Sequence, residues 1–383
     1  MQNGWTGGQY SLYRLLLGLY LVSFFARLLV DDSFPRSTVP FAPIGVVCGL
    51  ALALGWFDRA AAGLALIFGG IVLFLSSGPA EASLVYLGWL LFVHPFLQPA
   101  PYGSLAAAGR TDPGGGWRMN GWLYGCTWGL MALGYTYTGF SMLIYPGWLA
   151  GGAIDDYLFY RLPHVGSEGG WLLSSLEPVL PWVTRTVFAA HLLFGILALF
   201  RRARPWLWLV FASMQLLALG LPGAGSFGVR MLLLHGFTFD PAWIRPWLPR
   251  AQETLFYDGT CGLCHRCVRF LLAEDEDGRW RFAPLGGEAF HERVREDRRR
   301  GWPDSLVLRT ESGTLLTRST AVLHIARRLG GIWRLLGGGA ALVPRALRDG
   351  VYDLVARIRF RLFSRPGEVC PIVPERLRDR FLD

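Results

Sequence analysis

The chain contains no lysine. All 37 of its basic residues are arginine, so the formal net charge of +9 rests on guanidinium groups. Guanidinium stays protonated and does not serve as an ordinary base. The absence excludes a phosphate-loop ATPase, a Schiff-base enzyme and any enzyme with a lysine general base. No aromatic-plus-basic module accompanies the arginines, so we expect contact with anionic lipid head groups and no nucleic-acid partner.

Charged residues are also scarce before about residue 245, whereas apolar residues are abundant. The chain is 52% hydrophobic and 14% aromatic, and its mean hydropathy is +0.34. Such a composition is too apolar for one soluble domain of 383 residues. Residues 1–250 are therefore predicted to form a multi-pass membrane domain of about eight helices. The expected spans are Leu12–Val30, Phe41–Phe57, Ala60–Ser77, Ser83–Leu97, Trp122–Tyr145, Val183–Phe200, Trp206–Leu221 and Ser226–Phe239.

The distribution of arginine between the loops predicts the orientation. The first segment lacks a cleavage pattern and is interpreted as a retained anchor. With a cytoplasmic N-terminus, the outside loops are mostly acidic and the inside loops carry Arg59, Arg110, Arg118, Arg201, Arg202, Arg204, Arg245 and Arg250. Arginine accumulates in cytoplasmic loops, so we expect an integral protein of a bacterial-type cytoplasmic membrane with its C-terminal domain in the cytoplasm. That compartment is reducing and disfavours a structural disulfide.

Several ionisable residues lie in or beside these apolar segments, where a charge is costly. Arg14 and His94 are expected to snorkel at segment ends. His191 and His235 are deeper, and with Tyr135 and Tyr137 they are candidates for a polar pocket.

Two cysteines three residues apart stand where a predicted strand meets a predicted helix. The strand ends at Tyr257, the turn Asp258-Gly259-Thr260 follows, and Cys261 and Cys264 begin the helix. Unpaired N–H groups and the helix dipole stabilise a thiolate at such a position. We therefore expect Cys261 to be the more exposed and more acidic thiol, and Cys264 its buried partner. The arrangement is typical of thiol–disulfide exchange.

The predicted elements after Thr254 alternate in type. We expect strands at 254–257 and 279–282, a hairpin from strands 305–309 and 314–317, and helices at 261–274, 286–300 and 319–329. Strand, helix, strand, helix, hairpin and helix is the order of a thioredoxin-like α/β domain. The fold class is thus an α-helical polytopic membrane domain followed by a thioredoxin-like domain at 251–383.

The run Tyr257-Asp258-Gly259-Thr260-Cys261-Gly262-Leu263-Cys264 resembles the DCC family of predicted thiol–disulfide oxidoreductases. Pro303-Asp304-Ser305 and the tail from Tyr352 through Cys370-Pro371 to Leu382 strengthen the resemblance. It implies disulfide reductase or exchange activity, with Cys261 as the attacking thiol and Cys264 as the resolving thiol. Asp258 would tune the pair or accept a proton.

A second resemblance concerns the membrane part. The run from Tyr135 through Gly139 to Leu143, followed by Trp148 and Gly151-Gly152-Ala153, is similar to the HTTM domain of vitamin K-dependent carboxylases. Ser141 and Met142 stand where those carboxylases place lysines, so carboxylase chemistry is not expected. A generic DoxX-type membrane domain is the alternative.

Other roles for the cysteines stay open at this point. Cys264 and Cys267 repeat the spacing, and with Cys261 and Cys370 they could bind zinc or an iron–sulfur cluster. The strand–turn–helix context favours redox chemistry without a cofactor or metal. Cys48 and Cys126 are expected to be packing residues, and His265 a surface histidine.

Together these features predict a membrane-tethered protein-disulfide reductase that exchanges with protein or small-molecule thiols and disulfides through Cys261 and Cys264. The alternative is a membrane enzyme or carrier for a lipid-like or quinone-like substrate, with the cysteine domain as a redox-sensing module.

Overall fold

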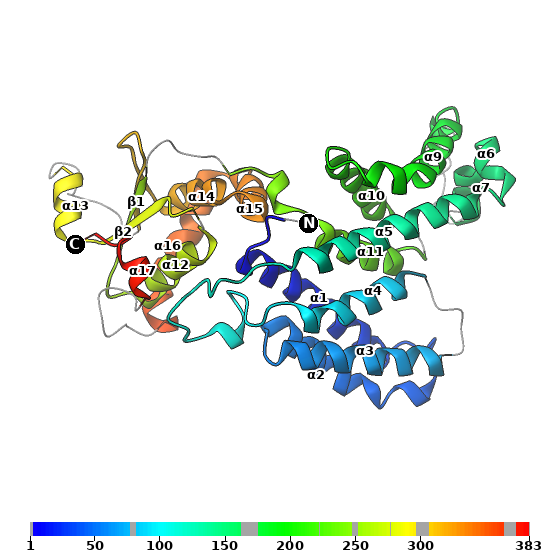
Figure 1. The fold of residues 1–383 in the computed structure, drawn as a ribbon, viewed down its shortest axis with the longest axis horizontal. Helices are drawn as coiled ribbons and strands as arrows, with labels where there is room; N and C mark the ends of the chain where they lie inside the picture. The colour runs from blue at the N-terminus through cyan, green and yellow to red at the C-terminus, as the bar shows by residue number, and fades with distance from the viewer. Residues whose placement is uncertain are drawn as a thin grey trace.

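A computed structural model describes residues 3–76, 82–161, 175–221, 223–246, 252–275, 277–295, 306–363 and 373–382. A helical region up to residue 246 and a smaller α/β region from residue 252 lie side by side along the long axis of the molecule (Figure 1). Their hydrophobic cores are separate, because one cluster of buried residues runs from Trp5 to Phe239 and two others lie after Glu253.

All eight predicted apolar segments are helical in the structure. They correspond to α1 (Gly7–Arg27), α2 (Phe41–Leu54), α3 (Asp58–Leu75), α4 (Ala82–Val93), α5 (Gly121–Met142), α9 (Leu180–Ala198), α10 (Arg204–Ala218) and α11 (Gly225–Thr238). Two short helices that we did not expect, α6 (Pro146–Ala150) and α7 (Ala153–Arg161), lie between α5 and α9. Length and apolar composition therefore predicted helices correctly.

Glycines allow the first two helices to pack backbone to backbone. A Cβ on Gly18 of α1 would lie 2.5 Å from the Ala53 nitrogen of α2, and one on Gly49 would lie 2.8 Å from the Val22 nitrogen. No side chain larger than glycine fits at either position. Close contact through small residues is typical of helix pairs in membranes.

Two helices of the described residues, α3 and α9, are long and apolar enough to cross a membrane by length and composition. Phe41–Leu54 and Ser83–Phe96 are apolar but shorter. Only 28% of the apolar stretch of α3 and 22% of that of α9 is buried inside the protein. Both helices thus present most of their apolar surface outward.

The structure corrects the interpretation of Arg14 and His94. Neither side chain snorkels, because both are buried and converge on Asp58 at the start of α3. Arg14 Nη1 lies 3.7 Å and His94 Nε2 lies 3.5 Å from Asp58 Oδ2, and the Tyr10 hydroxyl lies 2.6 Å from His94 Nδ1. Charge pairing inside the bundle replaces contact with water.

Three of the four residues expected to form a polar pocket lie together in the helical region. Tyr135 contacts the rings of His191 and His235, and Gln215 donates a hydrogen bond of 3.2 Å to its hydroxyl. Tyr137 does not join them, because two residues along a helix turn it outward, where its side chain is 73% exposed. Cys48 is buried as predicted, whereas Cys126 is exposed on α5.

The α/β region contains a four-stranded mixed sheet in the order β2-β1-β3-β4. Its strands are β1 (Glu253–Tyr257), β2 (Trp280–Pro284), β3 (Val307–Arg309) and β4 (Leu315–Thr317). β1 pairs in parallel with β2 and antiparallel with β3, and β3 pairs antiparallel with β4. The predicted order of strands and helices is therefore present. The predicted helix at 286–300 is shorter, and its last residues lie outside the described part.

Helices cover both faces of this sheet. Alternate residues of β1 point to opposite faces, so Leu255 packs with α12 (Gly262–Glu274) and α14 (Arg318–Leu329), whereas Phe256 packs with α13 (Glu288–Arg293). The chain then forms α15 (Gly331–Ala341), α16 (Arg345–Leu362) and α17 (Glu375–Arg378), which we did not predict. After α17, Phe381 forms a parallel bridge with Phe282 of β2.

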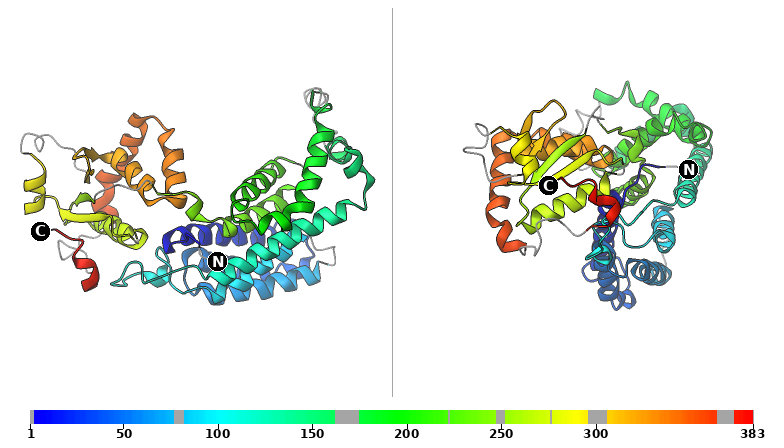
Figure 2. Two further views of the ribbon diagram at one scale, coloured as in Figure 1. Left: turned by 45° about the horizontal axis from the view of Figure 1, so that its top comes forward. Right: turned by 60° about the vertical axis from the view of Figure 1, so that its left-hand side comes forward.

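The two regions meet at the C-terminal end of α12, beside the start of α1 (Figure 2). The buried Glu274 carboxylate accepts hydrogen bonds from Thr6 Oγ1 at 2.5 Å, the Gly8 nitrogen at 2.8 Å and Trp333 Nε1 at 2.6 Å. Because the first N–H groups of a helix lack partners within it, Glu274 supplies an N-terminal cap for α1 from the other region. The regions are thus joined by buried polar contacts.

Candidate redox site

The cysteine motif lies where β1 ends and α12 begins. The carboxylate of Asp258 closes the turn, because Oδ1 accepts hydrogen bonds from the Thr260 nitrogen at 2.9 Å and the Thr260 hydroxyl at 2.8 Å. The Cys261 nitrogen donates to the Asp258 carbonyl at 3.2 Å. Cys261 is then the N-cap residue of α12. The strand–turn–helix arrangement predicted from the sequence is therefore present.

The predicted order of exposure is wrong. Cys261 is 0% exposed, whereas Cys264 is half-buried. The reason is helical periodicity: Cys261 lies on the same stripe as His265, Val268 and Leu272, all of which are buried against the core. Cys264 lies at the edge of that stripe. No helix N–H group donates a capping hydrogen bond to the Cys261 side chain.

The two thiols contact each other. Burial raises the pKa of Cys264 well above its usual range, and the hydrogen bond with Cys261 raises it further. Cys264 therefore keeps its proton, and its S–H group is close enough to donate to the Cys261 sulfur. Both cysteines are free thiols in this structure. Two adjacent free thiols suit stepwise exchange, because the second can attack a mixed disulfide formed at the first.

Cys267 lies one turn further along α12 and is half-buried. Burial raises the pKa of its thiol to about 11, with a smaller contribution from Cys261. Among the described residues no three His, Cys, Asp or Glu side chains are arranged to hold a metal ion. Cys370, the fourth candidate ligand, lies outside the described residues, as do Pro303, Asp304 and Ser305.

Two partners of the motif were not found from the sequence. Arg359 of α16 forms an ion pair with Asp258, with 3.1 Å between Nη2 and Oδ2, and its side chain is only 5% exposed. His265 is buried rather than on the surface, and its Nε2 lies 3.0 Å from the Gly259 carbonyl. Arg359 is 101 residues from Asp258 in the chain. Only the fold brings them together, although Arg359 belongs to the tail that carries the family resemblance.

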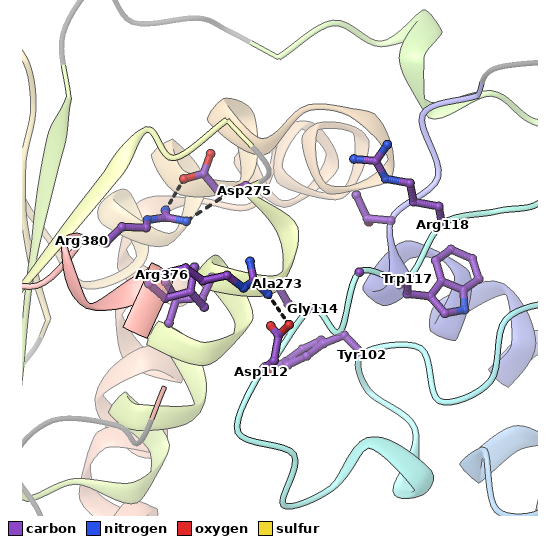
Figure 3. Close-up of a pocket in the computed structure, with 14 residues that line it drawn as sticks. Tyr102, Asp112, Gly114, Trp117, Arg118, Ala273, Asp275, Arg376 and Arg380 are labelled. Carbon is purple, nitrogen blue, oxygen red and sulfur yellow. Dashed lines mark hydrogen bonds and ion pairs between the residues drawn. The ribbon is translucent and has the colours of Figure 1, made fainter. Parts of the chain in front are cut away.

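A separate cavity of about 210 Å³ lies between the two regions (Figure 3). Arg376 pairs with Asp112 on one side of it, and Arg380 pairs with Asp275. Leu272 and Ala273 line it from the C-terminal end of α12, whereas the cysteines are at the N-terminal end. This cavity is therefore not part of the cysteine site.

Known proteins are similar to the α/β region. Residues 255–365 match the DCC1-like thiol-disulfide oxidoreductase family. The uncharacterized protein YuxK of Bacillus subtilis is 35% identical over 135 residues, which are 34% of this chain and 94% of YuxK. A chloroplastic DCC family protein of Arabidopsis thaliana is 29% identical over 114 residues, 30% of this chain and 66% of that protein. No solved structure matches the chain.

YuxK is matched over nearly its whole length, and the matched part of this chain contains the strand, the turn and the cysteine-bearing helix described above. Through its α/β region, the chain belongs to the DCC1-like thiol-disulfide oxidoreductase family.

Proposed function

We propose that the protein is a membrane-embedded thiol–disulfide oxidoreductase that reduces or exchanges disulfides through Cys261 and Cys264. The observation that carries the proposal is the contact between these two free thiols at the start of α12, in a region that matches an oxidoreductase family. The sheet order, with a helix directly after the central parallel strand, supports a thioredoxin-like fold for residues 251–383.

The proposed reaction moves two electrons from the cysteine pair to a substrate disulfide. The Cys261 thiolate attacks one substrate sulfur, which breaks the substrate disulfide, forms a mixed disulfide and releases one substrate thiolate. Cys264 then gives up its proton to Asp258 and attacks the Cys261 sulfur, which breaks the mixed disulfide, releases the second substrate thiolate and leaves a Cys261–Cys264 disulfide. Both substrate thiolates take up protons from Asp258 and water. A dithiol reductant restores the pair. Because Cys261 is covered, the substrate must displace the groups around it.

Asp258 has two roles in this proposal. Its Oδ1 closes the turn that precedes Cys261, and its Oδ2 forms an ion pair with Arg359 that fixes the orientation of the carboxylate. Its side chain is 23% exposed, so it can reach solvent and accept the proton that Cys264 releases.

The outward apolar surface of the helical region supports a membrane location. Large apolar side chains are more than half exposed on most of its long helices, including Leu16 60%, Val47 61%, Ile67 58%, Phe74 84%, Leu133 71%, Trp182 68%, Ile196 59% and Leu217 74%. Soluble monomers rarely expose so much contiguous apolar surface, which marks a membrane or protein contact. The arginine-rich loops support a cytoplasmic α/β region. We extend the proposal to an HTTM-like fold for residues 1–250.

The direct test is reduction of insulin disulfides by the full chain in detergent, with dithiothreitol as the electron source. We expect Cys261→Ser and Cys264→Ser to lower the rate to that of dithiothreitol alone. Asp258→Asn should lower it by about tenfold, the size of one lost charge-assisted interaction. Cys126→Ser is the matched control, because Cys126 is exposed on α5 outside the α/β region.

Trapping separates the roles of the two cysteines. Cys264→Ser should accumulate mixed disulfides at Cys261, whereas Cys261→Ser should not accumulate them at Cys264. Full activity of Cys261→Ser would refute the exchange mechanism. If all variants and the unmodified chain lack reductase activity while Cys264 still oxidises reversibly, the redox-sensing alternative holds.

A further inference from the structure

A second cavity lies in the helical region, at the end of the bundle away from the cysteines. Its volume is about 420 Å³, and it is enclosed by the last turns of α1 and α3, the first turn of α11 and the start of α4. The 21 residues of α1 separate it from the α/β region, a rise of roughly 30 Å at 1.5 Å per residue.

The lining of this cavity is cationic and rich in hydroxyl groups at one side. Arg230 is 4% exposed, and its guanidinium donates to Ser83 Oγ at 2.7 Å and to the Tyr20 hydroxyl at 3.2 Å. Arg27 and Asp31 also line it. Two guanidinium groups and one carboxylate give this side a formal excess of one positive charge, which favours an anion.

An apolar groove of about 90 Å³ lies beside this cavity, between α1, α3 and α4. Phe24, Leu73 and Leu84 line both hollows, which are therefore adjacent. Glycines form part of its lining, so no side chains fill the space beside them. A Cβ on Gly70 would meet nothing within 4 Å, and one on Gly88 would lie 3.7 Å from Leu66.

We propose that this cavity and groove bind an anionic membrane phospholipid, with its phosphate at Arg27 and Arg230 and one acyl chain along Gly70 and Gly88. The cationic cavity matches the head group of an anionic phospholipid, and the apolar groove beside it matches an acyl chain. Guanidinium groups bind phosphate through paired hydrogen bonds, and the cavity hydroxyls supply further donors. This site adds to the proposed redox function and relies on the proposed membrane location of the helical region.

Native mass spectrometry of the full chain in detergent, with dioleoyl phosphatidic acid added, tests the proposal. We expect the unmodified chain to bind this lipid at least tenfold more tightly than dioleoyl phosphatidylcholine. Arg27→Gln and Arg230→Gln should each weaken binding by about tenfold, the scale of one hydrogen bond to a charged group. Arg27 is exposed, so its replacement leaves the fold intact if the buried Arg230 proves necessary for folding.

The groove has its own matched pair of variants on α3. Gly70→Leu fills the groove and should also weaken binding, whereas Gly63→Leu, which likewise meets nothing within 4 Å but lies outside the groove, should not. The proposal would be overturned if the zwitterionic lipid bound equally well, or if the Gly70→Leu variant bound the anionic lipid as tightly as the unmodified chain. Displacement of the lipid by millimolar inorganic phosphate would mean that the cavity binds free anions instead. Carbonate extraction of the chain from membranes would show separately that the membrane location is wrong.

Discussion

The buried face of α12 determines how accessible each of its three cysteines is to solvent. Cys261 shares this face with Val268 and is covered, whereas Cys264 and Cys267 stand beside it and keep partial access to solvent. Solvent access and the position at the helix N-terminus therefore belong to different thiols. Cys264 is reachable but holds its proton, and Cys261 has the helix N-terminus but no opening to solvent. In the proposed mechanism, substrate binding therefore has to uncover Cys261 before exchange begins.

Cys267 offers a test of this environment. Its pKa of about 11 lies above the value of about 8.5 for an unfolded thiol. Alkylation of native Cys267 by iodoacetamide should thus rise about a hundredfold between pH 8 and 10, since each pH unit raises the thiolate fraction tenfold. In urea the rate should level off near pH 9. The folded chain binds more protons in this window, so its stability should fall as pH rises through it.

Peptide mapping can follow Cys267 alone, because trypsin cleavage after Arg266 separates it from Cys261 and Cys264. A native rate that already levels off below pH 9 would contradict the described burial.

Helix α12 connects the two regions of the molecule. Its first residues carry the cysteines, and its last residue, Glu274, caps α1 and accepts a hydrogen bond from Trp333 of α15. Phe270 packs edge to face on Trp333, with 4.9 Å between ring centres, and contacts Tyr102 of the helical region. The redox helix is consequently held at its C-terminal end by both regions.

Replacing Glu274 should weaken this junction. Glu274→Ala leaves the Gly8 nitrogen and two side-chain donors without their acceptor, so we expect it to destabilise the full chain by about 2–4 kcal/mol. Thermal unfolding followed by tryptophan fluorescence in detergent measures the effect. Glu292→Ala, at an exposed position of α13, should change stability by less than about 0.5 kcal/mol. Equal melting temperatures for the two variants would exclude a role for Glu274 in the junction.

The candidate redox site lies at one end of the molecule and the candidate lipid site at the other (Figures 1 and 2). The helix α1 runs between them, with its N-terminus at Glu274 and its last turn at the cavity that Arg230 lines. If the helical region spans a bilayer, the two sites face opposite sides of the membrane, because the length of α1 is close to the thickness of the hydrocarbon core.

Reporter fusions test this arrangement. We expect a C-terminal green fluorescent protein to be bright in a bacterial host and a C-terminal alkaline phosphatase to be inactive, since the inside loops carry the arginines. A phosphatase fused after Asp32, in the first outside loop, should be active. Active phosphatase at the C-terminus would reverse the orientation and place the cysteine pair in an oxidising compartment.

Local features of the sequence determined the secondary structure. Apolar length predicted the eight long helices described in the first region, and the alternation of strands and helices predicted where the four strands of the sheet lie. The turn Asp258-Gly259-Thr260 before Cys261 located the candidate site, because turn and capping preferences depend on neighbouring residues. The stripe of Cys261, His265, Val268 and Leu272 was also readable at helical spacing, and it predicts the burial of Cys261 that the dipole argument missed.

Contacts between distant segments were decided only by the tertiary structure. Arg359 reaches Asp258 from α16, Glu274 caps α1 across 266 residues, and Arg14 and His94 meet at Asp58 instead of turning to water. The cavity beside Arg230 likewise requires four helices to come together. Residue spacing shows which side of a helix a residue occupies, but not which element faces that side. The partner of a buried charge depends on which element faces it, because only an oppositely charged or hydrogen-bonding group at the right position offsets the cost of removing the charge from water.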